Sequence, residues 1–244
     1  MCFHVNLTFS TGTSPRDPNS AELHSPKMSP KNRVEVIRHE QIGSGGSGTE
    51  VWRVSIDDWQ CCAKTIQISS SHLADVEAFE KEIEILKELP CHHQHIARYI
   101  TCDELLLANR SFGRYLGYQR CEDKLELFMC LYDGSVFNLI RSRRPLKFEL
   151  SRILDISVCV LSALVTLHSR KLIHRDVKSQ NVFYQTLEGG RFKFVLGDFG
   201  QSKLMLKKKT TTVSGTSRWI APEIFRNEGG YSLEADMWSF GMFL

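Results

Sequence analysis

The chain changes its hydrophobic pattern part-way along its 244 residues, and this change limits the folds that it can adopt. Residues 34–67 and 125–132 contain short runs rich in β-branched and aromatic residues, which are typical of strands. Residues 150–171 instead form a segment that is apolar over most of a helix circumference, which predicts burial on several sides. We therefore expect an α+β, bilobal fold, with a small β-rich lobe at residues 34–131 and a mainly helical lobe at residues 132–244.

The first 33 residues have a different character. Residues 10–33 are rich in Ser, Pro, Asn and charged residues and show no hydrophobic period, so residues 1–33 are predicted to be a disordered leader. The first ten residues lack the basic start and the long apolar core of a signal peptide. No uninterrupted apolar run approaches ~20 residues, so no membrane span is expected.

Charge and cysteine usage exclude other classes of protein. The net charge of +3 is small and dispersed, so we do not expect a nucleic-acid partner. The eight cysteines show neither a C-x-x-C spacing nor a Cys/His ligand pattern. Several lie inside apolar runs, as buried thiols do, which favours a reduced protein in the cytoplasm.

A glycine cluster separates the first two strand-like runs. Gly43, Gly45 and Gly48 have the spacing G-x-G-x-x-G, which also occurs in dinucleotide-binding loops. A dinucleotide loop opens a helix, whereas here a second β-rich run follows at residues 49–56. The sequence therefore predicts a hairpin loop whose backbone amides cover phosphates.

A lysine ends the apolar run "CCAK" on the third predicted strand. Lys64 either extends from a strand end to solvent or pairs with an acid. Residues 73–89 have helical spacing, with apolar positions at Val76, Phe79, Ile83 and Leu86. The helix also supplies an acid one turn before its last apolar position, and we expect this residue, Glu82, to pair with the lysine.

The stretch "HRDVKSQN" carries the strongest chemical signal. Asp176 is placed to orient an attacking hydroxyl or accept its proton, and Lys178 to neutralise charge on a transferring phosphoryl group. Asn181 and the Asp198 of a following "DFG" are predicted metal ligands. A carboxylate and an amide oxygen suit Mg²⁺, which keeps few protein ligands and shares substrate phosphates.

Taken in order, these motifs resemble the eukaryotic protein kinase family, from Val34 to the end of the chain. The resemblance implies binding of ATP and Mg²⁺, with the glycine loop over the phosphates, Lys64 and Glu82 as an ion pair, and Asp176 as the catalytic base. It also implies that "APE" at residues 221–223 closes the activation segment and that Asp236 anchors the catalytic loop.

The adenine site follows from the same resemblance. Its expected contacts are Val51, Cys62, Met129, Cys130 and Leu131. Glu50 stands where the family usually has an adenine-packing valine, so either the strand carries a bulge or adenine packing is weaker.

Substrate type and regulation are inferred from the second half of the chain. Lys178 and Thr216 are the residues that serine/threonine kinases have at these positions, whereas "RWIAPE" is shared with tyrosine kinases. This combination resembles the tyrosine-kinase-like group, whose members mostly phosphorylate serine or threonine. Dual specificity stays open. Arg175 precedes the predicted base, as in kinases that an upstream kinase activates by phosphorylating the activation loop. The candidate acceptors are Thr210, Thr211, Thr212 and Ser214, which otherwise are solvated loop residues.

The chain ends within "DMWSFGMFL", an apolar helix that continues into further helices in kinases of this type. On this basis we expect a fragment with apolar side chains partly uncovered, poor solubility and little turnover. Two alternatives to a protein serine/threonine kinase stay open. One is a pseudokinase or scaffold that binds nucleotide, and the other is a small-molecule phosphotransferase of similar fold.

Overall fold

A computed structural model describes most of the chain after the leader. The described residues are 36–44, 48–56, 59–69, 73–90, 92–100, 118–120, 123–142, 148–205, 215–226, 230 and 232–244. The chain falls into two units, Met1–Arg33 and Val34–Leu244, and every described residue belongs to the second. The predicted leader and the four candidate phosphate acceptors lie outside the described residues, and the division into lobes at residue 131 stays a prediction.

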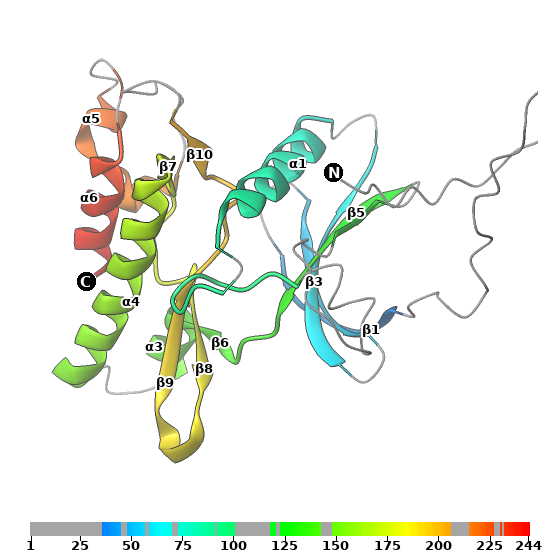
Figure 1. The fold of residues 1–244 in the computed structure, drawn as a ribbon, viewed down its shortest axis with the longest axis horizontal. Helices are drawn as coiled ribbons and strands as arrows, with labels where there is room; N and C mark the ends of the chain where they lie inside the picture. Colours follow the sequence, from blue (N-terminus) through cyan, green and yellow to red (C-terminus); the bar gives the residue numbers. More distant parts are fainter. Residues whose placement is uncertain are drawn as a thin grey trace, which may run out of the picture. The chain divides into compact units, whose positions relative to one another are not determined.

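The first half of the described chain forms a five-stranded antiparallel sheet with the order β1-β2-β3-β5-β4 (Figure 1). Its strands are β1 (Val36–Ser44), β2 (Glu50–Ile56), β3 (Trp59–Gln67), β4 (Tyr118–Arg120) and β5 (Lys124–Cys130). The pairing of β2 with β3 is regular, whereas β1 shifts register between Arg38 and Glu40 and again between Gln41 and Gly43. The irregularity near the glycine cluster is therefore a bulge in β1 and not in β2.

The two faces of this sheet bury different side chains. One face contributes Leu125 and Leu127 to the main core, which also contains the apolar stripe of α1 (Leu73–Glu88). That stripe is Val76, Phe79, Ile83 and Leu86, as the helical period predicted. The opposite face contains a second cluster, formed by Val54, Ile56, Cys61, Ala63, Ile100 and Phe128.

The second half of the described chain carries helices and two small sheets (Figure 1). The helices are α3 (Val136–Ser142), α4 (Leu150–Ser169), α5 (Pro222–Phe225) and α6 (Glu234–Phe243). One sheet has the order β6-β8-β9, from Gly134–Ser135, Val182–Thr186 and Phe192–Leu196, and the other pairs β7 (Leu172–Ile173) with β10 (Lys203–Leu204). The predicted α+β fold class is confirmed.

The central helix α4 is buried on one face and exposed on another. Its buried side chains are Ile156, Cys159, Val160, Ala163, Leu164 and Leu167. Leu154, Val158 and Val165 are more than half exposed, so burial on several sides is not found among the described residues. By length and composition alone, α4 is also apolar enough to cross a membrane, a property that core helices of soluble proteins share.

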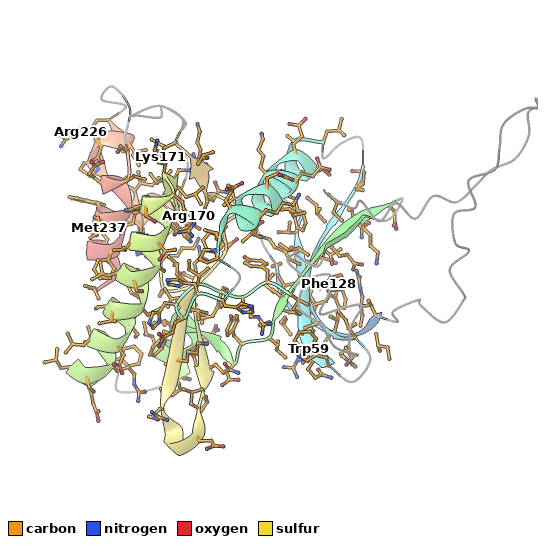
Figure 2. The ribbon with its side chains drawn as sticks, viewed as in Figure 1. Trp59, Phe128, Arg170, Lys171, Arg226 and Met237 are labelled. Carbon is orange, nitrogen blue, oxygen red and sulfur yellow. The ribbon has the colours of Figure 1, made fainter. Side chains whose placement is uncertain are left out.

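The last helix, α6, is likewise only partly covered. Asp236, Ser239 and Phe240 are buried in it, whereas Met237 and Trp238 are nearly half exposed, and Met237 is labelled in Figure 2. Apolar side chains of this helix therefore reach the surface of the described structure, as the sequence predicted.

We predict that two neighbouring positions of α4 respond very differently to truncation. Leu164 is 1% exposed, so Leu164→Ala leaves a cavity and should lower the free energy of unfolding by about 3 kcal/mol. Val165 is 69% exposed, and Val165→Ala, the matched control, should change it by less than about 0.5 kcal/mol. Urea denaturation followed by circular dichroism measures both, and equal losses would contradict the described burial of α4.

Candidate active site

A buried carboxylate on α6 fixes the loop that follows β7. Asp236 is fully buried, and its two oxygens accept hydrogen bonds from the backbone N–H groups of His174 and Arg175, at 2.9 and 2.8 Å. The Nε2 of His168, on α4, donates to the same carboxylate at 2.8 Å. Arg175 has a φ of 68°, a conformation that costs a non-glycine residue about 1–3 kcal/mol. The hydrogen bonds to Asp236 offset this strain, as expected for an anchoring aspartate.

The side chain of Asp176 is held by three neighbours. Asn181 Nδ2 donates to its Oδ2 at 2.9 Å, and the ammonium of Lys178 lies 2.6 Å from the same oxygen. The hydroxyl of Thr216 donates to Oδ1 at 2.6 Å and accepts a hydrogen bond from the Lys178 ammonium at 2.8 Å. The structure thus brings together three predicted site residues and adds Thr216, which the sequence had indicated only as a marker of substrate type.

The approach of Thr216 depends on the glycine before it. Gly215 has a φ of 115°, and a Cβ atom there would lie 2.5 Å from the carbonyl oxygen of Arg175. Any other residue would clash with the backbone of the loop and adopt a strained conformation. Glycine at this position therefore lets the two segments touch.

A second cluster joins three distant elements. The ammonium of Lys64, on β3, lies 2.7 Å from Glu82 Oε2, on α1, and 3.1 Å from Asp198 Oδ1, just after β9. The Glu82 side chain is 2% exposed, whereas that of Asp198 is 43% exposed and can meet a ligand. Lys64 is therefore paired rather than extended to solvent.

The charges in this cluster shift one another's pKa values. Burial opposes the charge of Lys64, but the carboxylates of Glu82 and Asp198 outweigh burial and raise the pKa of the lysine. The Lys64 ammonium in turn holds the pKa of Asp198 below its usual value. Burial raises the pKa of Glu82, and the lysine partly offsets this effect. Both Lys64 and Asp198 are thus charged at neutral pH.

The hairpin β8–β9 places the two predicted metal ligands beside each other. Asn181 immediately precedes β8, and Asp198 is the second residue after β9. The N–H of Gly197 donates to the carbonyl of Asn181 at 2.9 Å. The Nδ2 of Asn181 is engaged with Asp176, so its amide oxygen is the atom that does not take part in those bonds. An amide oxygen and a partly exposed carboxylate fit a hard divalent cation.

One buried histidine links the two clusters, and sequence reasoning assigned it no role. His174 is fully buried, accepts from the N–H of Asp176 at Nδ1 and donates from Nε2 to the carbonyl of Gly197, at 3.3 and 3.2 Å. Its ring lies 5.2 Å from that of Phe199, which is also fully buried. In the sequence, only the position of His174 next to Arg175 and Asp176 could have indicated a role, because motif spacing does not predict its contacts with Asp176 and Gly197.

Three of the predicted adenine contacts, Val51, Cys62 and Met129, fall on the face of the sheet that carries Lys64. Val51 is directly opposite Lys64 in the ladder, so the two side chains share a face. Glu50 instead accepts a hydrogen bond from the Trp52 indole at 2.9 Å. The predicted bulge in the strand of Glu50 is wrong, because β2 pairs regularly with β3 and the register shifts lie in β1. Val51 takes the inward position, and weaker adenine packing stays a prediction.

The remaining predicted nucleotide-binding residues lie at the end of β5, next to it on β3, and around the glycine cluster. The thiol of Cys62 lies against the carbonyls of Met129 and Cys130, at 3.6 and 3.5 Å, and burial raises its pKa. Leu131 follows β5 directly. Gly43 is the last residue but one of β1 and pairs with Val51, Gly48 has a φ of 68°, and Gly45 lies outside the described residues.

Comparisons with known proteins agree with this geometry. Residues 36–244 match the family model of the protein kinase domain. The chain is 33% identical over 211 residues to kinase and exchange factor for Rac B of Dictyostelium discoideum, an alignment that covers 83% of this chain and 17% of that protein.

Two further relatives carry kinase names. Human mitogen-activated protein kinase kinase kinase 3 is 29% identical, covering 90% of this chain and 33% of that protein. Mouse serine/threonine-protein kinase Nek1 is 30% identical, covering 86% and 16%. The chain thus spans a third or less of the length of each of these relatives.

We predict that removal of the Lys64 charge destabilises the protein at neutral pH and less in acid. Lys64→Met leaves Glu82 buried without its cation, which should lower the free energy of unfolding by about 3 kcal/mol. Because the pKa of Asp198 is lowered in the folded state, the stability from its pairing is present above about pH 4 and is lost as the pH falls through the folded pKa. The difference between variant and wild type should therefore shrink below about pH 4.

Two controls accompany this measurement by urea denaturation across pH. The double variant Lys64→Met/Glu82→Gln removes the unpaired charge and should recover most of the loss. Lys87 pairs with Glu84 at the surface of α1, so Lys87→Met should change stability by less than about 0.5 kcal/mol. A pH-independent loss in Lys64→Met would show that packing, not charge pairing, is the main contribution of Lys64.

Proposed function

Because the chain belongs to the protein kinase family, we propose that it transfers the γ-phosphoryl group of ATP to serine or threonine hydroxyls of protein substrates. The observation that carries this proposal is the environment of Asp176: a carboxylate with an amide, an ammonium and a hydroxyl within hydrogen-bonding distance, next to two predicted metal ligands. Phosphoryl transfer needs little covalent chemistry from the protein, so positioning and charge supply most of the catalysis.

Each residue of the site has a proposed task. Asp176 accepts the hydrogen bond of the substrate hydroxyl and takes its proton as the oxygen attacks. Lys178 stays cationic beside the transferring phosphoryl group and stabilises its charge. Lys64, oriented by Glu82, holds the phosphates of the nucleotide. Bound Mg-ATP supplies the phosphoryl group and the metal charge.

We propose Mg²⁺ as the metal, with Asn181 and Asp198 as its protein ligands. Mg²⁺ prefers oxygen ligands and usually binds one or two protein oxygens together with substrate phosphates. The partly exposed carboxylate of Asp198 and the side-chain amide oxygen of Asn181 would supply these two protein oxygens.

Serine or threonine as acceptor is supported by the contact between Lys178 and Thr216 at 2.8 Å, the two residues that carry the resemblance to serine/threonine kinases. The name of one relative, mouse serine/threonine-protein kinase Nek1, points in the same direction. We also propose activation by an upstream kinase that phosphorylates Thr210, Thr211, Thr212 or Ser214. The Arg175 side chain is half-buried and donates to the carbonyl of Gln201, near the start of that segment, and a guanidinium is a suitable partner for a phosphate.

A nucleotide-binding scaffold with little turnover is the second candidate. One observation favours it: both oxygens of Asp176 are already paired within the chain, with Lys178, Asn181 and Thr216. A substrate hydroxyl must therefore displace or share one of these partners.

We propose the reducing cytoplasm as the location of the protein, and the described cysteines, which are free thiols, support this proposal.

The proposal predicts that Asp176→Asn nearly abolishes phosphoryl transfer while ATP still binds. Loss of a general base lowers the rate about 100-fold to 10,000-fold. Transfer of labelled γ-phosphate to a generic protein substrate measures the first effect, and the shift in melting temperature on adding Mg-ATP measures the second. Asp155→Asn, a change at an exposed position of α4, is the matched control and should retain wild-type transfer.

Three outcomes can be told apart. Transfer that survives Asp176→Asn would contradict the proposed base. ATP binding without any transfer by the wild-type chain would favour the scaffold. A failure of both would contradict the proposed function.

A further inference from the structure

Two cysteines, one of them in the second apolar cluster, lie opposite each other on neighbouring strands of the sheet. Cys61 on β3 and Cys130 at the end of β5 are direct partners in the antiparallel ladder. Both are free thiols. Neither has a role in the proposed phosphoryl transfer that depends on its thiol.

The ladder shows which kind of pair this is. The carbonyl of Phe128 accepts from the N–H of Ile100, and the N–H of Cys130 donates to the carbonyl of Arg98, both at 3.0 Å. The polar groups of these alternate β5 residues therefore point away from β3, so Cys61 and Cys130 form a non-hydrogen-bonded pair. In such pairs the Cα atoms are about 4.5 Å apart and the side chains are closest. That spacing lies within the Cα range of disulfides, about 4.4 to 6.8 Å.

Other non-hydrogen-bonded pairs on the same face of β3 and β5 also have side chains that lie close to each other. Four residues further along β3, Thr65 lies opposite Glu126, and its hydroxyl is 3.4 Å from the carboxylate. Between the two pairs, Ala63 lies opposite Phe128, which is labelled in Figure 2, and both belong to the same apolar cluster as Cys61. The thiols of Cys61 and Cys130 thus share a face and a rung of the ladder.

We propose that Cys61 and Cys130 are a redox pair that forms a reversible cross-strand disulfide when the protein meets a peroxide. The proposal does not depend on phosphoryl transfer, because it concerns only these two thiols. The neighbouring Cys62 is excluded from the pair, since it lies on the opposite face, and its thiol is directed at backbone carbonyls.

The exposure of the two thiols sets the order of the reaction. Cys61 is fully buried, whereas Cys130 is partly exposed and lies near the cations Arg98 and Lys193, which favour its thiolate. Burial raises the pKa of both thiols, that of Cys61 to about 12, so the reaction is slow. Cys130 is therefore the residue that meets the peroxide, and Cys61 is the resolving residue.

The chemistry balances with hydrogen peroxide as oxidant. The Cys130 thiol loses its proton and its sulfur attacks one peroxide oxygen. The O–O bond breaks, and the other oxygen leaves as hydroxide and takes up that proton to form water, which leaves a sulfenic acid on Cys130. The Cys61 sulfur then attacks the Cys130 sulfur, the S–O bond breaks, and the oxygen leaves as water with the Cys61 proton. The two sulfurs lose two electrons in total, and the peroxide is reduced to two waters.

The test is a disulfide map of the full chain after treatment with hydrogen peroxide. Free thiols are alkylated and the protein is digested with trypsin, which releases Cys61 within residues 54–64 and Cys130 within residues 125–141. We expect these two peptides to be linked, and the link to disappear with dithiothreitol. The amount of linked peptide should fall at least about ten-fold in Cys61→Ala and in Cys130→Ser, because among the described cysteines these two are the pair that shares a face and a rung of the ladder. It should be unchanged in Cys62→Ala, the matched control.

A second measurement guards against misfolded variants. The oxidised wild-type chain should melt at a higher temperature than the reduced chain, since a cross-link restricts the unfolded state, and Cys130→Ser should lose this difference. A link that persists in Cys61→Ala, a link lost in Cys62→Ala, or no link between the two peptides in the wild-type chain would each overturn the proposal.

Discussion

A buried ammonium ion is the constraint on which the arrangement of the site depends. Lys64 cannot lie in an apolar sheet without opposite charge, and it finds one carboxylate on α1 and another after β9. The need to neutralise one charge therefore sets the position of a helix and of the segment that carries Asp198. Since Asp198 is also a proposed metal ligand, the same ion pair places the metal site relative to the sheet.

The loop around Asp176 follows a different physical rule. Its residues are positioned by hydrogen bonds from polar groups that would be costly to leave unsatisfied, and His174 shares its two ring nitrogens between Asp176 and Gly197. Asn181 also contacts both residues: its side-chain amide donates to Asp176, and its backbone carbonyl accepts a hydrogen bond from Gly197. The charged cluster and the polar loop are thus connected twice through residues 197 and 198. A displacement of this segment would disturb both clusters together.

Much of this was accessible from the sequence, for identifiable reasons. The period of the apolar residues in α1 fixed which face meets the core, and Glu82 beside that face predicted the partner of Lys64. The contacts of His168 and Thr216 were not predicted, because they join segments distant in sequence through side chains that are common on protein surfaces. The bulge beside the glycine cluster was expected at Glu50 but lies in β1, since a register shift is a property of two paired strands.

The anchoring of the loop by Asp236 has a consequence for the order of events during synthesis. The carboxylate lies 62 residues after His174 and 61 after Arg175, so the loop is made well before its anchor. At typical rates of translation this separation corresponds to about 3 to 12 seconds. During that interval Arg175 lacks the hydrogen bond that offsets its left-handed backbone conformation. The loop that carries Asp176 can therefore reach its final conformation only after α6 has been made. A nascent chain that has not yet added α6 has the side chains of the site but lacks the hydrogen bonds that position them.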